Sequence, residues 1–156
     1  MFYTIFESKL IGKILLYGDK TELYGLEFYK NTTLEKSWIE DKIVFQNVII
    51  QLEKYFNKEL KRFDIPLRLS GTPFQKRVYS QLLQIPYGST ISYQELAKRV
   101  DNEKASRAVG NANGKNPIAI IIPCHRVISK NGSIGGFSGG VDIKRKLLEL
   151  EGVQIR

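Results

Sequence analysis

The stretch Ser70-Gly71-Thr72-Pro73 divides the chain into two parts whose residue patterns differ. Residues 45–56, before this break, carry apolar side chains at the spacing of a helix. They are preceded by runs of β-branched and aromatic residues that are separated by glycines, a pattern typical of short strands, at residues 3–7, 13–17 and 23–29. The pattern predicts an N-terminal domain, residues 1–70, built from a small antiparallel sheet and a helix.

The second part, residues 71–156, has mainly helical signals. Thr72 and Gln75 have the spacing of a capping box, and Pro73 suits the first turn of a helix that runs to about residue 84. Ser92 and Glu95 form a similar pair at the start of a second helix. Helices are predicted at residues 92–100, 104–113 and 141–150, with Gly152 beyond the last of them. We therefore predict an α/β (α+β) chain whose C-terminal domain, residues 71–156, is mainly helical and contains a helix-turn-helix at 92–113.

Two short segments of the second part have weaker signals. Residues 118–122 form a buried, strand-like apolar run. Residues 127–134 surround Asn131-Gly132, a dipeptide that favours a hairpin-like turn.

The basic charge of the chain lies in its second part. The formal net charge is +8 over 156 residues, and almost all of the excess of Lys and Arg falls after residue 70. Such an asymmetry suits a polyanionic partner, with nucleic acid first and an anionic membrane second, although a merely soluble surface would carry similar charge.

The only cysteine, Cys124, stands beside the only histidine, His125. A neighbouring base helps a thiol to react as thiolate, so the pair indicates nucleophilic chemistry; a lone cysteine is also often a small buried apolar residue. One cysteine excludes an intrachain disulfide and fits a reducing compartment. One cysteine and one histidine make a poor zinc site, so we expect no metal. No signal peptide or membrane span is evident, and we expect a soluble cytoplasmic protein.

The predicted helix at 104–113 has one arginine, Arg107, among small side chains. Small residues allow a helix to approach a narrow groove closely, and the arginine could fill the gap left by an extruded base or clamp a phosphate. The same sequence also suits a short helix that packs on a neighbour, with Arg107 in a surface ion pair. Glu151 could polarise His125, or could simply be solvated.

Pro123-Cys124-His125-Arg126-Val127 resembles the active-site signature of the O6-alkylguanine-DNA alkyltransferases. The resemblance is close over residues 74–152 and only general over residues 1–70. Further motifs of that family occur in the same order, at residues 87–88, 91–93, 106–110, 114–117, 137–140, 147–148 and 151–152.

The resemblance implies a chemical role for five residues. Cys124 would take the alkyl group from O6 of guanine and keep it. His125 would accept the thiol proton through a water, supported by Glu151. Asn116 would tie the recognition helix to the active-site turn, and Tyr93 would help the flipped base to enter and stabilise the leaving group.

The resemblance also implies residues that bind substrate and DNA. Arg107 would occupy the place of the flipped base, and the backbones of Cys124, Val127 and Ser138 would contact the guanine edge. The other candidates are Ser106, Ala108, Gly110, Arg126 and Lys144. Phe137 stands where some members have tyrosine, so that phenolic hydroxyl is missing, and Ser106 stands where some have alanine.

The implied function is direct-reversal DNA repair by a single-turnover methylated-DNA–protein-cysteine methyltransferase. Its partner would be double-stranded DNA containing O6-alkylguanine, bound through the minor groove by a monomer. No cofactor and no membrane would be involved, and the protein would be cytoplasmic, at the nucleoid, or nuclear in a eukaryote. Two alternatives stay open at this point: a helix-turn-helix regulator whose cysteine is structural or senses oxidants or alkylators, and a cysteine hydrolase.

Overall fold

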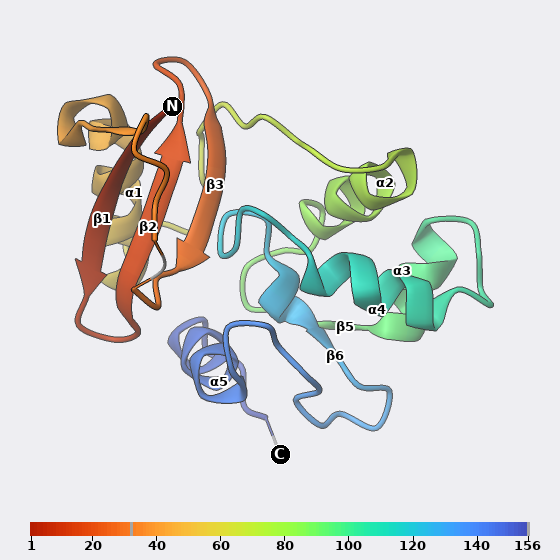
Figure 1. Ribbon diagram of the computed structural model, residues 1–156. Helices are drawn as coiled ribbons and strands as arrows, with labels where there is room; N and C mark the ends of the chain where they lie inside the picture. Colours follow the sequence, from red (N-terminus) through yellow and green to blue (C-terminus); the bar gives the residue numbers. More distant parts are fainter. Residues whose placement is uncertain (32, 156) are drawn as a thin grey trace. The chain divides into compact units, whose positions relative to one another are not determined.

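The computed structural model describes residues 1–31 and 33–155, and the chain forms two compact units. The first unit is Met1–Arg68, and the second begins at Leu69 (Figure 1). Within the described residues no helix is both long and apolar enough to cross a membrane.

The N-terminal unit is built on a four-stranded sheet. Its strands are β1 (Phe2–Ser8), β2 (Gly12–Gly18), β3 (Leu23–Phe28) and β4 (Ile39–Glu40), in the order β3-β2-β1-β4. The predicted antiparallel pairing of the first three strands is confirmed. The fourth strand was not predicted, and it runs parallel to β1. It is two exposed residues long, so it leaves no hydrophobic pattern in the sequence.

One helix covers this sheet. A short 3-10 helix, η1 (Lys42–Phe45), leads into α1 (Gln46–Phe56), which buries Val48, Ile49, Leu52 and Tyr55. The opposite layer of the core comes from β2 and β3, where Ile14, Leu16 and Leu26 are fully buried. The helix predicted at 45–56 is therefore confirmed, and Figure 1 shows it lying along one face of the sheet.

The C-terminal unit contains the four predicted helices. They are α2 (Pro73–Leu82), α3 (Tyr93–Arg99), α4 (Ser106–Gly114) and α5 (Val141–Leu150). The capping box at α2 is complete, because Thr72 Oγ1 accepts from the Gln75 N–H and the Gln75 side chain accepts from the Thr72 N–H. Ser92 caps α3 in the same way, by accepting from the Glu95 N–H at 3.0 Å. The consecutive helices α3 and α4 form the helix-turn-helix.

The two segments with weak signals differ from the prediction. Residues 127–128 form a strand, β6 (Val127–Ile128), but it pairs in parallel with β5 (Ile91–Ser92) and not with a hairpin partner. The Asn131-Gly132 turn does form, closed by hydrogen bonds between residues 129 and 132–133. Residues 118–122 are buried as predicted, yet they form a series of tight turns and no strand.

Candidate functional site

The turn that carries Cys124 is held by the side chain of Asn116. The Asn116 amide donates to the carbonyl of Ile122 at 2.7 Å, and its oxygen accepts from the Ile118 N–H at 3.0 Å. The loop between these contacts is so tight that Ile120 has φ +73°, a value that β-branched residues rarely adopt. The backbone groups of residues 118–122 form hydrogen bonds within the loop and with Asn116. This is why these residues do not form a strand.

Cys124 begins a 3-10 helix, η2 (Cys124–Arg126), and is 4% exposed. Burial raises the pKa of its thiol to about 11, although a hydrogen bond from Asn116 and the charge of Lys144 act in the opposite direction. The resting thiol is therefore protonated at neutral pH. A reaction at sulfur needs a group that removes this proton as the reaction proceeds.

His125 is fully buried and is hydrogen-bonded to Glu151, which follows α5. Its Nε2 lies 2.7 Å from Glu151 Oε2. Burial acts to raise the pKa of Glu151, but hydrogen bonds from His125 and Arg126 lower it to about 2, so the side chain is a carboxylate. A carboxylate only accepts hydrogen bonds, and His125 Nε2 therefore carries the proton.

The other ring nitrogen of His125 is thereby left as an acceptor. Burial lowers the pKa of His125, so the ring is neutral and Nδ1 holds a lone pair. Within the described part of the chain, Nδ1 is buried and has no hydrogen-bond partner. The arrangement supplies a base whose proton-bearing side is fixed by Glu151 and whose accepting side is unused.

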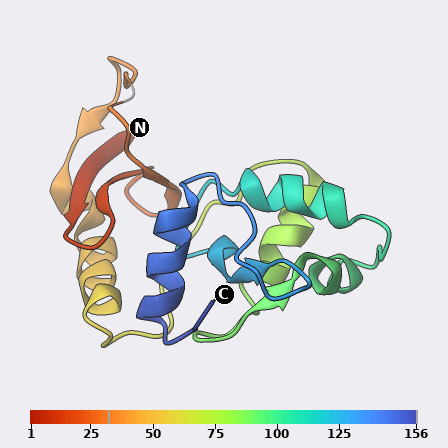
Figure 2. The same cartoon turned by 90° about the horizontal axis from the view of Figure 1, so that it is seen from below.

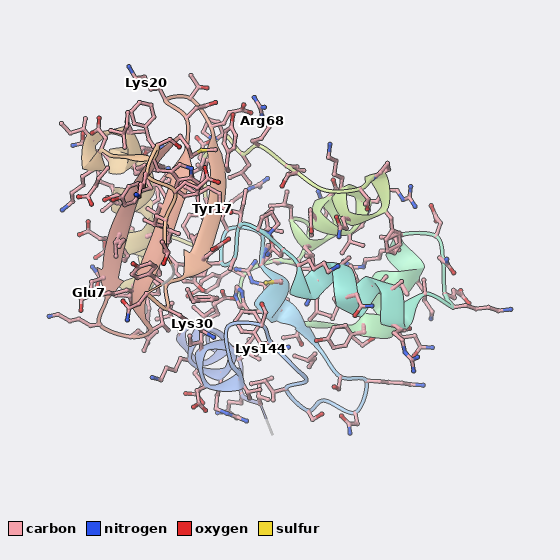
Figure 3. All side chains as sticks on the ribbon, viewed as in Figure 1. Glu7, Tyr17, Lys20, Lys30, Arg68 and Lys144 are labelled. Carbon is pink, nitrogen blue, oxygen red and sulfur yellow. The ribbon has the colours of Figure 1, made fainter. Side chains whose placement is uncertain are left out.

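Lys144 and Tyr93 are two further titratable residues that interact electrostatically with Cys124. Lys144, labelled in Figure 3, projects from α5 and is fully buried; its Nζ donates to the carbonyls of Val127 at 2.6 Å and Gly136 at 3.1 Å. It lies 5.8 Å from the centre of the Tyr93 ring. Burial lowers the pKa of Lys144 to about 8 and raises that of Tyr93, so the phenol keeps its proton. Figure 2 shows α5 beside the η2 segment, an arrangement that lets one helix supply Lys144 and lead into Glu151.

The outer face of α4 carries Arg107 and Ala108, both exposed, with Ser106 half-buried at the start of the helix. Gly110 is half-buried and faces Tyr93, because a Cβ there would lie 3.8 Å from the Tyr93 ring. Ser138 is exposed in the loop that precedes α5. The structure thus separates a buried cluster around Cys124 from an exposed, small-residue helix face with one arginine.

The position of Arg126 differs from the position that the sequence predicted. It was expected among the residues that bind DNA, but it is 6% exposed. Its Nε and Nη2 donate to Glu151 at 2.8 and 3.0 Å, and Nη1 donates to the Ile85 carbonyl at 2.7 Å. In this arrangement the guanidinium is used within the protein and is not offered to a phosphate.

Sequence reasoning missed Asn113. This residue is on α4, is 5% exposed, and donates from its side-chain amide to the Cys124 carbonyl at 3.2 Å. A signal was present, because Val109, Ala112 and Asn113 share the buried face of α4 at helical spacing. An amide on an otherwise apolar face points to a buried hydrogen bond.

Groups of three or more His, Cys, Asp or Glu side chains that could hold a metal ion do not occur among residues 1–31 and 33–155.

Comparison with known proteins identifies both units. The profile of the 6-O-methylguanine DNA methyltransferase DNA-binding domain matches residues 73–153, and that of the 6-O-methylguanine DNA methyltransferase ribonuclease-like domain matches residues 1–69. A methylated-DNA–protein-cysteine methyltransferase of Methanosarcina acetivorans is 52% identical over 155 residues, which covers 97% of this chain and 99% of the relative.

Solved structures of two similar proteins also resemble this chain. The structure of Mycobacterium tuberculosis OGT in complex with DNA superposes with a TM-score of 0.91 at 46% identity, covering 97% of this chain and 92% of that one. The structure of S. pombe Atl1 in complex with damaged DNA containing O6-carboxymethylguanine is 33% identical, with a TM-score of 0.50, and covers 56% of this chain and 83% of that one.

Proposed function

The chain belongs to the 6-O-methylguanine DNA methyltransferase family, and on that premise we propose that Cys124 is the residue that accepts the alkyl group. The protein repairs DNA by direct reversal. The sulfur attacks the alkyl carbon, an S–C bond forms, and the bond between that carbon and O6 of guanine breaks with its electrons passing to guanine. The hydrogen bond between His125 and Glu151, which leaves Nδ1 as a buried acceptor, is the observation that carries this proposal.

The proton of the thiol goes to His125. Because the pKa of Cys124 is raised to about 11, few molecules carry a thiolate at neutral pH, and proton removal has to accompany attack. Nδ1 of His125 accepts this proton through a water, and Glu151 stabilises the imidazolium that forms. Both partners are fully shielded from solvent, which strengthens their interaction in the low-dielectric interior.

The guanine that leaves gains negative charge, and donors are needed to neutralise it. Tyr93 remains protonated because burial raises its pKa, and its hydroxyl, which donates to the Gly136 carbonyl at 3.5 Å, turns to donate to the base. Lys144 holds the carbonyls of Val127 and Gly136, and so positions the backbone of β6 and of the loop that contains Ser138. We assign the contacts with the guanine edge to the backbones of Cys124, Val127 and Ser138.

The exposed face of α4 binds double-stranded DNA through the minor groove. Ser106 and Ala108 are small enough for close approach, and Arg107 enters the stack in place of the base that moves to Cys124. Mycobacterium tuberculosis OGT and S. pombe Atl1 were solved in complex with DNA, and we extend DNA binding to this chain because α4 presents an exposed face of small residues with one arginine. A monomer suffices, since every proposed residue comes from residues 71–156 of one chain. We place the protein in the cytoplasm, at the DNA that it repairs.

Each molecule acts once. The product is a thioether, and the chain has no second cysteine that could exchange with it. No metal or soluble cofactor takes part in the proposed chemistry.

The test is a mass spectrum of the protein after incubation with a duplex that contains O6-methylguanine. We expect the mass of one methylene group on the peptide that contains Cys124, a yield that stops at one per molecule, and no addition in Cys124→Ser. Lesion binding with an unmodified peptide would support a DNA-binding regulator, and repeated turnover of a model ester would support a cysteine hydrolase; either result overturns the proposal.

A further inference from the structure

Arg126 is the buried charge that the alkyl-transfer proposal leaves without a role. Its guanidinium makes a two-pronged contact with Glu151 and a third hydrogen bond with the Ile85 carbonyl. Bidentate contacts between arginine and a carboxylate fix geometry as well as charge. Glu151 is thus shared, with Oε2 accepting from both His125 Nε2 and Arg126 Nη2.

Because Glu151 also contacts Arg126, it favours the protonated form of His125 less strongly than it would alone. A carboxylate that faced the ring alone would favour the imidazolium strongly, because an opposite charge within hydrogen-bond distance stabilises the protonated form. The guanidinium neutralises much of that carboxylate, and the remaining interaction orients the ring more than it charges it.

We propose that Arg126 is a positioning residue that keeps His125 in the neutral Nε2–H form, with Nδ1 ready to accept the thiol proton. This inference rests on the proposed function of His125 as the base for Cys124. It reassigns Arg126 from DNA binding to control of the protonation state of the base.

The groups that face His125 support this assignment. Glu151, after α5, is the carboxylate that acts on the His125 ring. Arg126 on η2 and Lys144 on α5 are the cations that act on it. Burial lowers the pKa of His125, Glu151 raises it, and the charges of Arg126 and Lys144 lower it again. Cys124 is neutral at rest because its own pKa is raised, so it adds no negative charge near the ring.

The proposal has a chemical consequence. If the Arg126 charge were removed, Glu151 would draw a proton onto His125 at higher pH. The imidazolium has hydrogen on both nitrogens and accepts no proton from the thiol. As the pH is lowered, alkyl transfer would then begin to slow at a higher pH than it does in the wild-type protein.

The single histidine makes a direct measurement possible. Labelling histidine with ¹⁵N in the full-length protein gives the ring signals of His125 alone, and their shifts distinguish both tautomers and the imidazolium. We compare wild type, Arg126→Gln and Arg126→Lys. Arg68→Gln is the matched control, since it removes an equal charge from the exposed ion pair with Glu22.

In the wild type we expect the neutral Nε2–H tautomer at pH 7 and a titration midpoint below the ordinary 6.5. In Arg126→Gln we expect the midpoint to rise by about one pH unit or more, with an equal shift of the pH at which the rate of alkyl transfer falls. Arg126→Lys keeps the charge but not the two-pronged contact, so it should restore part of the wild-type behaviour, and Arg68→Gln should leave both readings unchanged.

Three results would overturn the proposal. One is an imidazolium, or the Nδ1–H tautomer, in the wild-type protein at pH 7. This result does not depend on whether any variant folds. Another is an unchanged midpoint in folded Arg126→Gln, and a third is an equal shift in Arg126→Lys, which would assign the effect to packing and not to charge. None of these depends on whether Cys124 takes the alkyl group, which the mass spectrum decides separately.

Discussion

Asn113, on the second helix of the helix-turn-helix, donates a hydrogen bond of 3.2 Å to the carbonyl of Cys124. The helix that carries Arg107 is therefore tied directly to the residue that we propose as the acceptor. The Asn113 side-chain oxygen is buried and has no partner among the described residues, which costs free energy. Asn113 gains one hydrogen bond but leaves its own side-chain oxygen unpaired, so it adds little to the stability of the fold. Its presence is better explained by its effect on the position of Cys124.

Replacing Asn113 by alanine should separate these two roles. The hydrogen bond is lost, but the unpaired oxygen goes with it, and Cys124 O still accepts from the Val127 N–H. We expect the free energy of unfolding in urea to change by less than about 1 kcal/mol. We expect single-turnover transfer from duplex DNA to slow by about tenfold, because the cysteine turn is no longer held by the helix.

Asn111→Ala is the control for helix propensity, since Asn111 is an exposed asparagine of the same helix. Both substitutions gain the same few tenths of a kcal/mol from alanine. A loss of several kcal/mol in Asn113→Ala, with normal transfer per folded molecule, would show that Asn113 only stabilises the fold.

The parts of this structure that the sequence predicts are those that neighbouring residues determine. The capping box of α2, the start of α3 at Ser92 and the end of α5 before Gly152, which has φ +83°, all depend on contacts within four or five residues. Such contacts leave a spacing that can be read along the chain.

Long-range pairings leave no such spacing. The β5–β6 ladder joins residues 91–92 to 127–128, and each strand is too short to show an alternating pattern. Arg126 has a similar explanation: its neighbours Cys124 and His125 indicate chemistry, but its partners Ile85 and Glu151 are 41 and 25 residues away. The sequence indicates which residues react, and the fold determines which residues hold them.

Gly135 should be more sensitive to substitution than Gly132. Both have positive φ, +73° and +86°, so alanine at either position costs about 1 kcal/mol of backbone strain. A Cβ at Gly135 would also lie 3.3 Å from the Tyr93 ring and 3.2 Å from Ser129 Oγ, whereas a Cβ at Gly132 would contact nothing within 4 Å. Tyr93 or the loop would have to move by a few tenths of an ångström.

We therefore expect both alanine variants to lose similar stability in thermal unfolding, and only Gly135→Ala to slow alkyl transfer, by about threefold to tenfold. The comparison removes the backbone cost that the two variants share. Equal rates in the two variants would indicate that the position of the Tyr93 ring does not limit the reaction.

Arg107→Ala should slow repair of duplex DNA without slowing the reaction of free O6-benzylguanine. The free base needs no extrusion from a helix, which costs a few kcal/mol in DNA. Arg107 is exposed on α4, so its removal should leave the buried cluster and the fold unchanged. We expect a loss of about tenfold or more on the duplex and less than about twofold on the free base, measured as single-turnover rates.

Lys104→Ala is the matched control, because it removes an exposed positive charge that lies before the same helix. It should weaken DNA binding in a way that depends on salt, through lost phosphate neutralisation, with little effect on the rate at saturating DNA. If Arg107→Ala slowed both substrates equally, the arginine would have no part in extruding the base.

The Cys124 thiol should titrate well above its ordinary pKa of 9.0. Burial raises its pKa to about 11, and the charge of Lys144 acts against this rise. Because the chain has one cysteine, ¹³C labelling at its Cβ gives a single signal whose shift follows ionisation. Below the midpoint the thiolate fraction rises tenfold with each pH unit, so direct attack of the thiolate on free O6-benzylguanine should accelerate as pH rises above neutral, in addition to the reaction that His125 assists.

Lys144→Met should leave a midpoint near 11 almost unchanged, because the pKa of Lys144 is about 8 and its charge is largely lost before the thiol titrates. Lys146→Met is the control on the exposed face of the same helix and should leave the midpoint unchanged. A wild-type midpoint at or below 9.0 would mean that the positive surroundings of Cys124 outweigh its burial. Only a midpoint below about 7 would leave most of the thiol ionised at neutral pH, and the requirement for a base during attack would then disappear.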